Sequence, residues 1–94
     1  MKVYTMQDIE NFEKDECGRL ICPSGDYTQI KSFGERCSFG EGCSFGECCK
    51  FGEGCSFGKG CSFGEGCSFG ECCRFGEGCN LDNNLKFENI ADVV

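Results

Sequence analysis

Cysteine is the residue type with the greatest capacity for chemistry in this sequence. The 94 residues include twelve Cys and no His. A thiol becomes an effective nucleophile when a base, usually His, lies beside it. With no such base available, and with most thiols expected to point inward, we predict that the protein is not an enzyme and has no catalytic residues.

The cysteine spacing also argues against a metal centre. Structural zinc sites usually combine two Cys-x2-Cys pairs at a distance, and this spacing does not occur. The adjacent pairs Cys48-Cys49 and Cys72-Cys73 could supply thiolates, but ten Phe residues are unlike the composition of a chain built only to hold metal. We predict no metal ligands and no cofactor.

Eight of the cysteines instead recur once every six residues. A small buried side chain would be placed in this way, and free Cys is among the most buried residue types. The N-terminal region offers no apolar stretch able to serve as a secretory signal or a membrane span, which favours a reducing compartment. We therefore expect reduced structural thiols and a cytoplasmic protein. The eight residues are Cys37, Cys43, Cys49, Cys55, Cys61, Cys67, Cys73 and Cys79.

The six-residue spacing belongs to a repeat that runs from Phe33 to Asn80. Its units are FGERCS, FGEGCS, FGECCK, FGEGCS, FGKGCS, FGEGCS, FGECCR and FGEGCN. Read from Cys, each unit is Cys-Ser-Phe, in which apolar and polar residues alternate as in a strand, followed by the turn Gly-Glu-Gly. One such strand cannot bury its own inner face, so the units must stack as parallel strands about 4.8 Å apart. The predicted fold is an all-β parallel β-solenoid.

The remaining segments are predicted to cap the solenoid. Residues 1–26 form the N-terminal cap, in which Thr5 and Asp8 have the spacing of a helix capping box. Met6, Ile9 and Phe12 would lie on one face of that short helix. Leu20 and Ile21 then form a short extended piece.

The repeat solenoid is assigned to residues 27–80, starting with a degenerate unit at Tyr27. Residues 81–94 lose the Gly and Cys pattern but keep Leu81, Leu85, Phe87 and Ile90. This segment is predicted to be the C-terminal cap, which would protect the open strand edge from end-to-end association.

The order of the deviant units favours a coil of twelve residues. The first, third, fifth and seventh units depart from FGEGCS before their last position, whereas the others match it up to that point. Such alternation indicates a structural repeat of two units. Two strands would then run in opposite directions, with the Phe of one facing the Cys of the other across about 10 Å.

The repeat also resembles the hexapeptide-repeat family, in which each unit has an apolar residue, then Gly, and a small residue at the fifth place. Phe33-Gly34 with Cys37 and Phe39-Gly40 with Cys43 show the match. The resemblance implies a three-sided parallel β-helix with eighteen residues per coil. Because Phe replaces the usual Leu, Ile or Val, three rings per layer would have to share the axis, and we favour the twelve-residue coil.

A second resemblance is to small FGEGCS-repeat proteins of unknown role that phages and mobile elements encode. It covers the repeat array and the lead-in Cys22-Pro23-Ser24-Gly25-Asp26-Tyr27. This likeness implies a phage-type origin but no activity.

Charge gives the main indication of function. The formal net charge of −7 argues against direct binding of nucleic acid, which needs a basic face. In a twelve-residue coil, one edge would carry four Glu residues in consecutive coils without a base. We predict that this edge binds a host protein with a basic surface, as an acidic inhibitor or a mimic of nucleic acid. The predicted binding residues are Glu41, Glu53, Glu65 and Glu77.

Other functions remain open on the sequence. The Glu residues could simply keep the turns soluble, which would make the protein a structural or self-assembling module, and a homo-oligomer is compatible with this reading. Ice binding is less favoured, since the array presents Ser in place of ranks of Thr.

Overall fold

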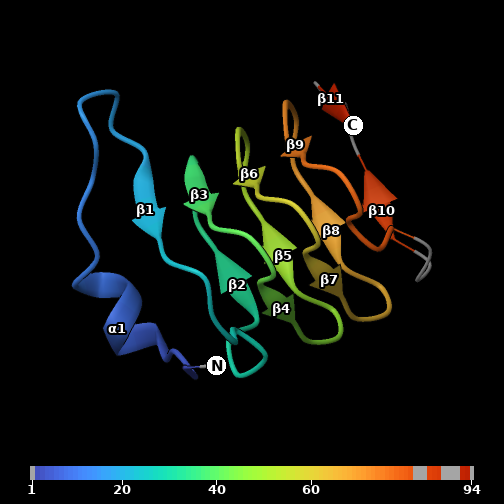
Figure 1. The fold of residues 1–94 in the computed structure, drawn as a ribbon, viewed down its shortest axis with the longest axis horizontal. Coiled ribbons are helices and arrows are strands. Elements are labelled where there is room, and N and C mark those ends of the chain that lie inside the picture. Colours follow the sequence, from blue (N-terminus) through green and yellow to red (C-terminus); the bar gives the residue numbers. More distant parts are fainter. Residues whose placement is uncertain (1, 82–84, 88–91, 94) are drawn as a thin grey trace.

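The computed structural model describes residues 2–81, 85–87 and 92–93. These residues form one short helix and eleven short strands, which wind into a parallel β-solenoid (Figure 1). The predicted all-β fold with a short N-terminal helix is confirmed. The elements are α1 (Met6–Glu10), β1 (Leu20–Cys22), β2 (Ser32–Phe33), β3 (Cys37–Phe39), β4 (Ser44–Phe45), β5 (Lys50–Phe51), β6 (Ser56–Phe57), β7 (Ser62–Phe63), β8 (Ser68–Phe69), β9 (Arg74–Phe75), β10 (Lys86–Phe87) and β11 (Asp92–Val93).

The strands form three parallel sheets, one on each side of the coil. The five-stranded sheet has the order β1-β3-β6-β9-β11, the four-stranded sheet has the order β10-β8-β5-β2, and β4 pairs with β7 in the third. Isolated bridges extend the third sheet from Asp26 to Ser44 and from Ser62 to Asn80. Consecutive strands in the chain therefore belong to different sheets.

The strand register shows that one coil takes eighteen residues. Ser38 pairs with Ser56, and Ser56 pairs with Arg74. On the next side, Ser32 pairs with Lys50. The twelve-residue coil that the alternation of units favoured is therefore wrong, and the three-sided coil implied by the resemblance agrees with the register.

Three Phe rings per coil fill the axis without conflict. Each repeat Phe contacts the Phe of the following unit edge to face, with ring centroids 4.9 to 5.3 Å apart and interplanar angles of 83° or more. Each also stacks on the Phe one coil away, with centroids 4.8 to 5.1 Å apart. Both arrangements suit the ring quadrupole. The rings thus form a continuous core in which Phe meets Phe, and the expected Phe-to-Cys contact across a flat coil is not formed.

From the second unit on, the first glycine of the unit permits the coils to stack closely. A Cβ atom on Gly64 would lie 2.5 Å from the carbonyl carbon of Gly46 in the preceding coil. Gly58 meets Gly40 in the same way, at 2.7 Å. Real Cβ atoms do not approach backbone so closely, so any larger residue would separate the coils. This contact explains why Gly follows Phe in the repeat units.

The N-terminal segment covers the first coil. Thr5 and Asp8 form the predicted capping box at the start of α1, and the Asp8 amide donates to Thr5 Oγ1 at 3.4 Å. Phe12 packs edge to face on Tyr4, which stacks on the buried Tyr27 ring. Met6 was expected on the same buried face but is 52% exposed, because only Ile9 and Phe12 reach the core.

Both segments assigned as caps also continue the sheets. β1 lies within residues 1–26 and pairs with β3, with Leu20 opposite Cys37. After the array, Phe87 of β10 pairs with Phe69 of β8, and β11 pairs with β9. The sheets thus extend beyond residues 27–80 in both directions. Ile90 lies outside the described residues.

Candidate functional site

The charged side chains of the repeat lie at three corners of the coil, each a stack of turns between two sheets. Corner A joins the four-stranded to the five-stranded sheet, corner B joins the five-stranded to the third sheet, and corner C joins the third to the four-stranded sheet. The residues at the Glu position of each turn, all of them exposed, are Glu35, Glu53 and Glu71 at corner A, Glu41, Lys59 and Glu77 at corner B, and Glu47 and Glu65 at corner C.

The four predicted binding residues do not share an edge. Glu41 and Glu77 lie at corner B, Glu53 at corner A and Glu65 at corner C. Because a coil takes eighteen residues, a step of twelve moves two-thirds of the way around the axis and changes the corner. Lys59 also separates Glu41 from Glu77. The predicted uninterrupted acidic edge made of these four residues is therefore wrong, whereas their capacity to bind a partner stays a prediction.

At corner A the Glu position is occupied by a carboxylate in three consecutive coils, Glu35, Glu53 and Glu71. We call these three residues the acidic rank. The Arg36 amide donates to the Glu53 carbonyl and the Gly54 amide to the Glu71 carbonyl, which places the three turns directly above one another. Arg19 ties the rank to the cap, because its guanidinium donates to the Gly54 carbonyl at 3.2 Å and to Ser56 Oγ at 3.1 Å.

The carboxylates of the acidic rank make no close ion pair in the described part of the chain, although Arg19 and Arg36 lie at the same corner. Within residues 2–81, 85–87 and 92–93, no ion pair involves Glu35, Glu53 or Glu71. Like charges in adjacent parallel strands repel one another, so this arrangement opposes stability to a modest degree. Sequence reasoning missed this rank because it depends on the eighteen-residue period.

The inward cysteines have a structural role that explains their residue type. From the second coil on, the thiol of each unit donates to the carbonyl of a Gly twenty-one residues earlier, as Cys67 does to Gly46 at 3.2 Å and Cys79 to Gly58 at 3.3 Å. That carbonyl lies at a corner, where the ladder hydrogen bonds are interrupted. A thiol is small enough for the interior and still offers a donor. Seven of the eight predicted inward Cys are buried, and Cys79 is partly buried.

The pKa values of several buried thiols are raised, which favours their neutral form, whereas the hydrogen bond with Cys61 lowers the pKa of Cys43 to about 7. Burial raises the pKa of Cys49 to about 11, and the neighbouring Cys67 adds to the shift. The hydrogen bond to Cys22 raises the pKa of Cys37 to about 12. A neutral, enclosed thiol is a poor nucleophile. All twelve Cys are free thiols in the structure, and the described residues contain no group of three or more metal-ligating side chains.

Two cysteines depart from this pattern. Cys48 and Cys72 take the place of the second turn Gly and are exposed at corners C and A. Their φ angles are 55° and 61°, in the left-handed region that Gly occupies in equivalent turns, such as Gly66 at 77°. Arg36 shares this conformation, with φ of 55°. These turns therefore carry backbone strain.

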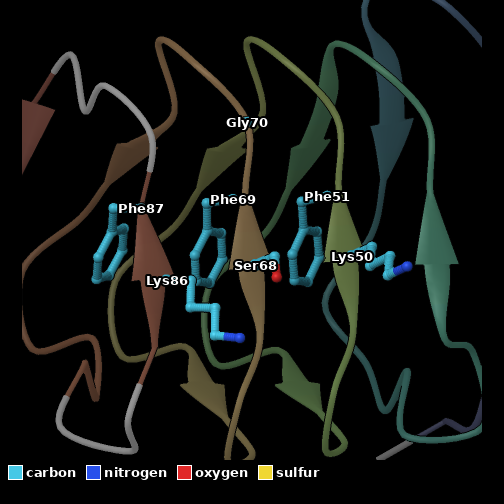
Figure 2. Close-up of a pocket in the computed structure, with 7 residues that line it drawn as sticks. All are labelled: Lys50, Phe51, Ser68, Phe69, Gly70, Lys86 and Phe87. Carbon is cyan, nitrogen blue, oxygen red and sulfur yellow. The ribbon is translucent and has the colours of Figure 1, made fainter.

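The four-stranded sheet presents a hollow on its outward face. A pocket of about 380 Å³ lies along β5, β8 and β10 (Figure 2). The outward side chains of this sheet alternate in register, because Lys50 pairs with Ser32 and Ser68, and Ser68 pairs with Lys86. The pocket is lined by Lys50, Phe51, Ser68, Phe69, Gly70, Lys86 and Phe87.

Sequence reasoning also missed this cationic hollow. Lys50 and Lys86 are thirty-six residues apart, so a period of twelve would align them with each other but would leave Ser68 on another side of the coil. An eighteen-residue period aligns Ser32, Lys50, Ser68 and Lys86, and it would have revealed them.

Comparison with known proteins gives no further guidance. No family model, no curated protein and no solved structure matches the chain. Among the described residues there is no helix with the length and apolar character needed to cross a bilayer. The functional argument therefore depends on the geometry of the corners and sheet faces.

Proposed function

We propose that this protein is a non-catalytic binding protein that presents corner A to a basic surface on another protein. The carrying observation is that Glu35, Glu53 and Glu71 occupy the Glu position of three consecutive coils, where corner B has Lys59 in the middle. The bases at corner A, Arg19 and Arg36, make no ion pair with them within the described residues. A surface selected only for solubility and stability would mix the two signs of charge, as surfaces of stable proteins commonly do. Three carboxylates in one rank make the electrostatic potential at the corner more negative, which attracts basic partners.

The spacing of the rank supports a finer version of the proposal, in which the corner imitates a nucleic-acid strand. Phe51 and Phe69, in adjacent coils, have ring centroids 5.0 Å apart, which sets the repeat of the corner. One DNA strand carries a charge about every 3.4 Å along the helix axis. The carboxylates of the acidic rank are somewhat farther apart than the phosphates of one DNA strand. The flexible Lys or Arg side chains of a basic groove can adjust to this difference in spacing. An acidic inhibitor of phage type would act in this way on a host protein.

A structural or self-assembling module is the second candidate, and corner B favours it. There Lys59 stands between Glu41 and Glu77, with the Gly42 amide donating to the Lys59 carbonyl. Opposite charges in neighbouring coils attract, which is the arrangement that a purely structural stack would adopt. If corner A has the same role, its charges should matter only for solubility.

Neutralising corner A separates the two candidates. The test variant is Glu35→Gln/Glu53→Gln/Glu71→Gln, and the matched control is Glu41→Gln/Glu65→Gln/Glu77→Gln, which removes the same charge from the other corners. Binding of an oligolysine peptide would be measured by calorimetry at two salt concentrations, and proteins captured from host lysate would be identified by mass.

The proposal predicts that the corner A variant binds the peptide at least about tenfold more weakly than the control, a difference of about 1.4 kcal/mol, and loses a captured protein that the control retains. Equal weakening in both variants would show a general charge effect and would contradict a specific corner. An unchanged capture profile in the corner A variant would favour the structural module.

A further inference from the structure

The outward face of the four-stranded sheet differs in charge from the rest of this acidic chain. In the strands β2, β5, β8 and β10, the outward positions alternate between Ser and Lys, and none of them is acidic. The chain as a whole has a net charge of −7. Two cations on one face of such a protein are therefore a local feature that its overall composition does not predict.

The two lysines flank Ser68, which lines the pocket. Lys50 and Lys86 pair with Ser68 from opposite sides, so each stands one strand away from it, or about 4.8 Å. Their side chains are longer than this distance, and both ammonium groups can reach the space above the Ser68 hydroxyl. The pocket of about 380 Å³ gives room for a small ligand in that space.

Figure 2 shows the present orientation of these groups. Lys86 extends across β8 next to Ser68, whereas Lys50 extends away from Ser68, toward β2. Within the described residues, neither lysine side chain makes an ion pair. An exposed lysine changes rotamer within nanoseconds, so Lys50 can turn toward a ligand without a change in the fold.

The charges that surround the pocket limit the class of ligand. Glu53 and Glu71 lie at corner A on one side of the sheet, and Glu47 and Glu65 lie at corner C on the other. These carboxylates repel a long anionic polymer laid across the sheet, whereas a small anion above Ser68 meets the two cations first. At one end of the pocket, Phe87 is 38% exposed and offers a ring face to an organic group.

We propose that Lys50, Ser68 and Lys86 form a binding site for the phosphate group of a small phosphorylated molecule. Two ammonium groups balance a phosphate dianion, and the Ser68 hydroxyl donates to one of its oxygens. This site is separate from corner A and does not depend on the function proposed for it. An open site of this kind should bind with a dissociation constant on the order of 1 mM.

Titration by nuclear magnetic resonance tests the site. The probes are inorganic phosphate, adenosine monophosphate and adenosine, each added to the full chain at constant ionic strength. We expect phosphate to shift the amide signals of Lys50, Ser68 and Lys86 selectively. Tighter binding of adenosine monophosphate would show that the ligand's organic part contacts Phe87, and equal binding would assign the site to the phosphate group alone; both results support the proposal.

The test variant is Lys50→Gln/Lys86→Gln, and the matched control is Lys59→Gln/Arg74→Gln, which removes two cations from exposed positions outside the pocket. The proposal predicts about tenfold weaker phosphate binding in the test variant and an unchanged constant in the control. Ser68→Ala, which leaves the charge intact, should weaken binding by a smaller factor. Equal weakening in the test and control variants, shifts spread over all cationic residues, or no shift at 20-fold the expected constant of about 1 mM would each overturn the proposal.

Discussion

At the residue scale, the repeat unit assigns one physical task to each of its positions. The first Gly admits the neighbouring coil, as the 2.5 Å approach at Gly64 shows, and the second Gly adopts the left-handed turn. Phe supplies the stacked core. Cys fills the remaining interior volume and donates to a corner carbonyl, as Cys61 does to Gly40 at 3.5 Å. The Glu and Ser positions point outward and are free of such a constraint, and they are where the surface charge varies, as Lys59, Lys50 and Arg74 show.

The neutral thiols make stability depend on pH. The pKa values of Cys49 and Cys55 in the folded chain are about 11, above the value of about 8.5 for an unfolded thiol. The folded state thus retains protons that the unfolded state loses, and stability is fully present below about pH 8.5 and falls as the pH rises toward 11. Each such thiol contributes at most about 1.4 kcal/mol per pH unit in this window.

Chemical denaturation from pH 7 to pH 10.5, with a reducing agent present, measures this effect. The contribution of Cys49 and Cys55 to the free energy of unfolding should be constant up to about pH 8.5 and then decline, whereas Cys43, whose pKa is lowered to about 7, adds stability between about pH 7 and 8.5. A Cys49→Ala/Cys55→Ala variant, which starts from a lower stability, should decline less steeply. If the two proteins follow parallel curves, titration of these thiols is not the cause.

Relief of turn strain provides a second prediction at this scale. Cys48 is exposed and has φ of 55°, so Cys48→Gly removes a left-handed conformation that costs a non-Gly residue about 1 to 2 kcal/mol. Gly also increases the conformational entropy of the unfolded chain, which offsets part of this effect. The free energy of unfolding of the variant should therefore rise by about 0.5 to 1 kcal/mol. The control is Gly66→Ala, at the same corner one coil later, which should lose stability. A lower melting temperature for Cys48→Gly would contradict the claim that the backbone at Cys48 is strained.

At the scale of the element, single strands of two or three residues have no stability of their own. β4 consists of Ser44 and Phe45, and it is held by pairing with β7 and by ring contacts on both sides. Short strands and turns of this kind are stable only in a stack, as in other solenoids. A substitution in the middle of the stack is therefore expected to affect more neighbours than one at its end.

Two Phe substitutions test this dependence on position. Phe57 is 4% exposed and stacks on both Phe39 and Phe75, whereas Phe87 is 38% exposed and stacks on Phe69. Phe57→Ala should cost about 3 to 5 kcal/mol and Phe87→Ala clearly less. The midpoints of thermal unfolding, followed by circular dichroism, give the comparison. Equal shifts in midpoint for the two variants would contradict the prediction that a substitution in the middle of the stack costs more than one at its end.

At the scale of the whole molecule, the number of residues per coil decides where every surface group lies. With eighteen residues per coil, Glu35, Glu53 and Glu71 share corner A, and Lys50 and Lys86 flank Ser68. With twelve, Glu41 and Glu53 would share an edge, and the two lysines would be separated from Ser68. Both functional proposals therefore depend on the same geometric quantity.

The six-residue period was readable from the sequence, and so were the stacked strands, the inward Cys and the capping box at Thr5, because each follows from the residues of one unit. The number of residues per coil could not be predicted, because it depends on how the side chains of different units pack against one another. The edge-to-face contact that lets Phe39 and Phe45 share the axis has no sequence signal. The alternation of deviant units pointed the other way, and nothing in the structure explains it. The acidic and basic ranks were missed for the same reason.

The strand register can be measured directly through Arg74, whose side chain is unlike its Ser neighbours and gives distinct resonances. In the three-sided coil its amide donates to the Cys55 carbonyl at 2.9 Å, and it pairs with Ser56, eighteen residues earlier. Nuclear Overhauser spectroscopy on isotopically labelled protein should show backbone contacts between Arg74 and Ser56. Contacts between Arg74 and Ser62, twelve residues earlier, would contradict the coil and the surfaces built on it.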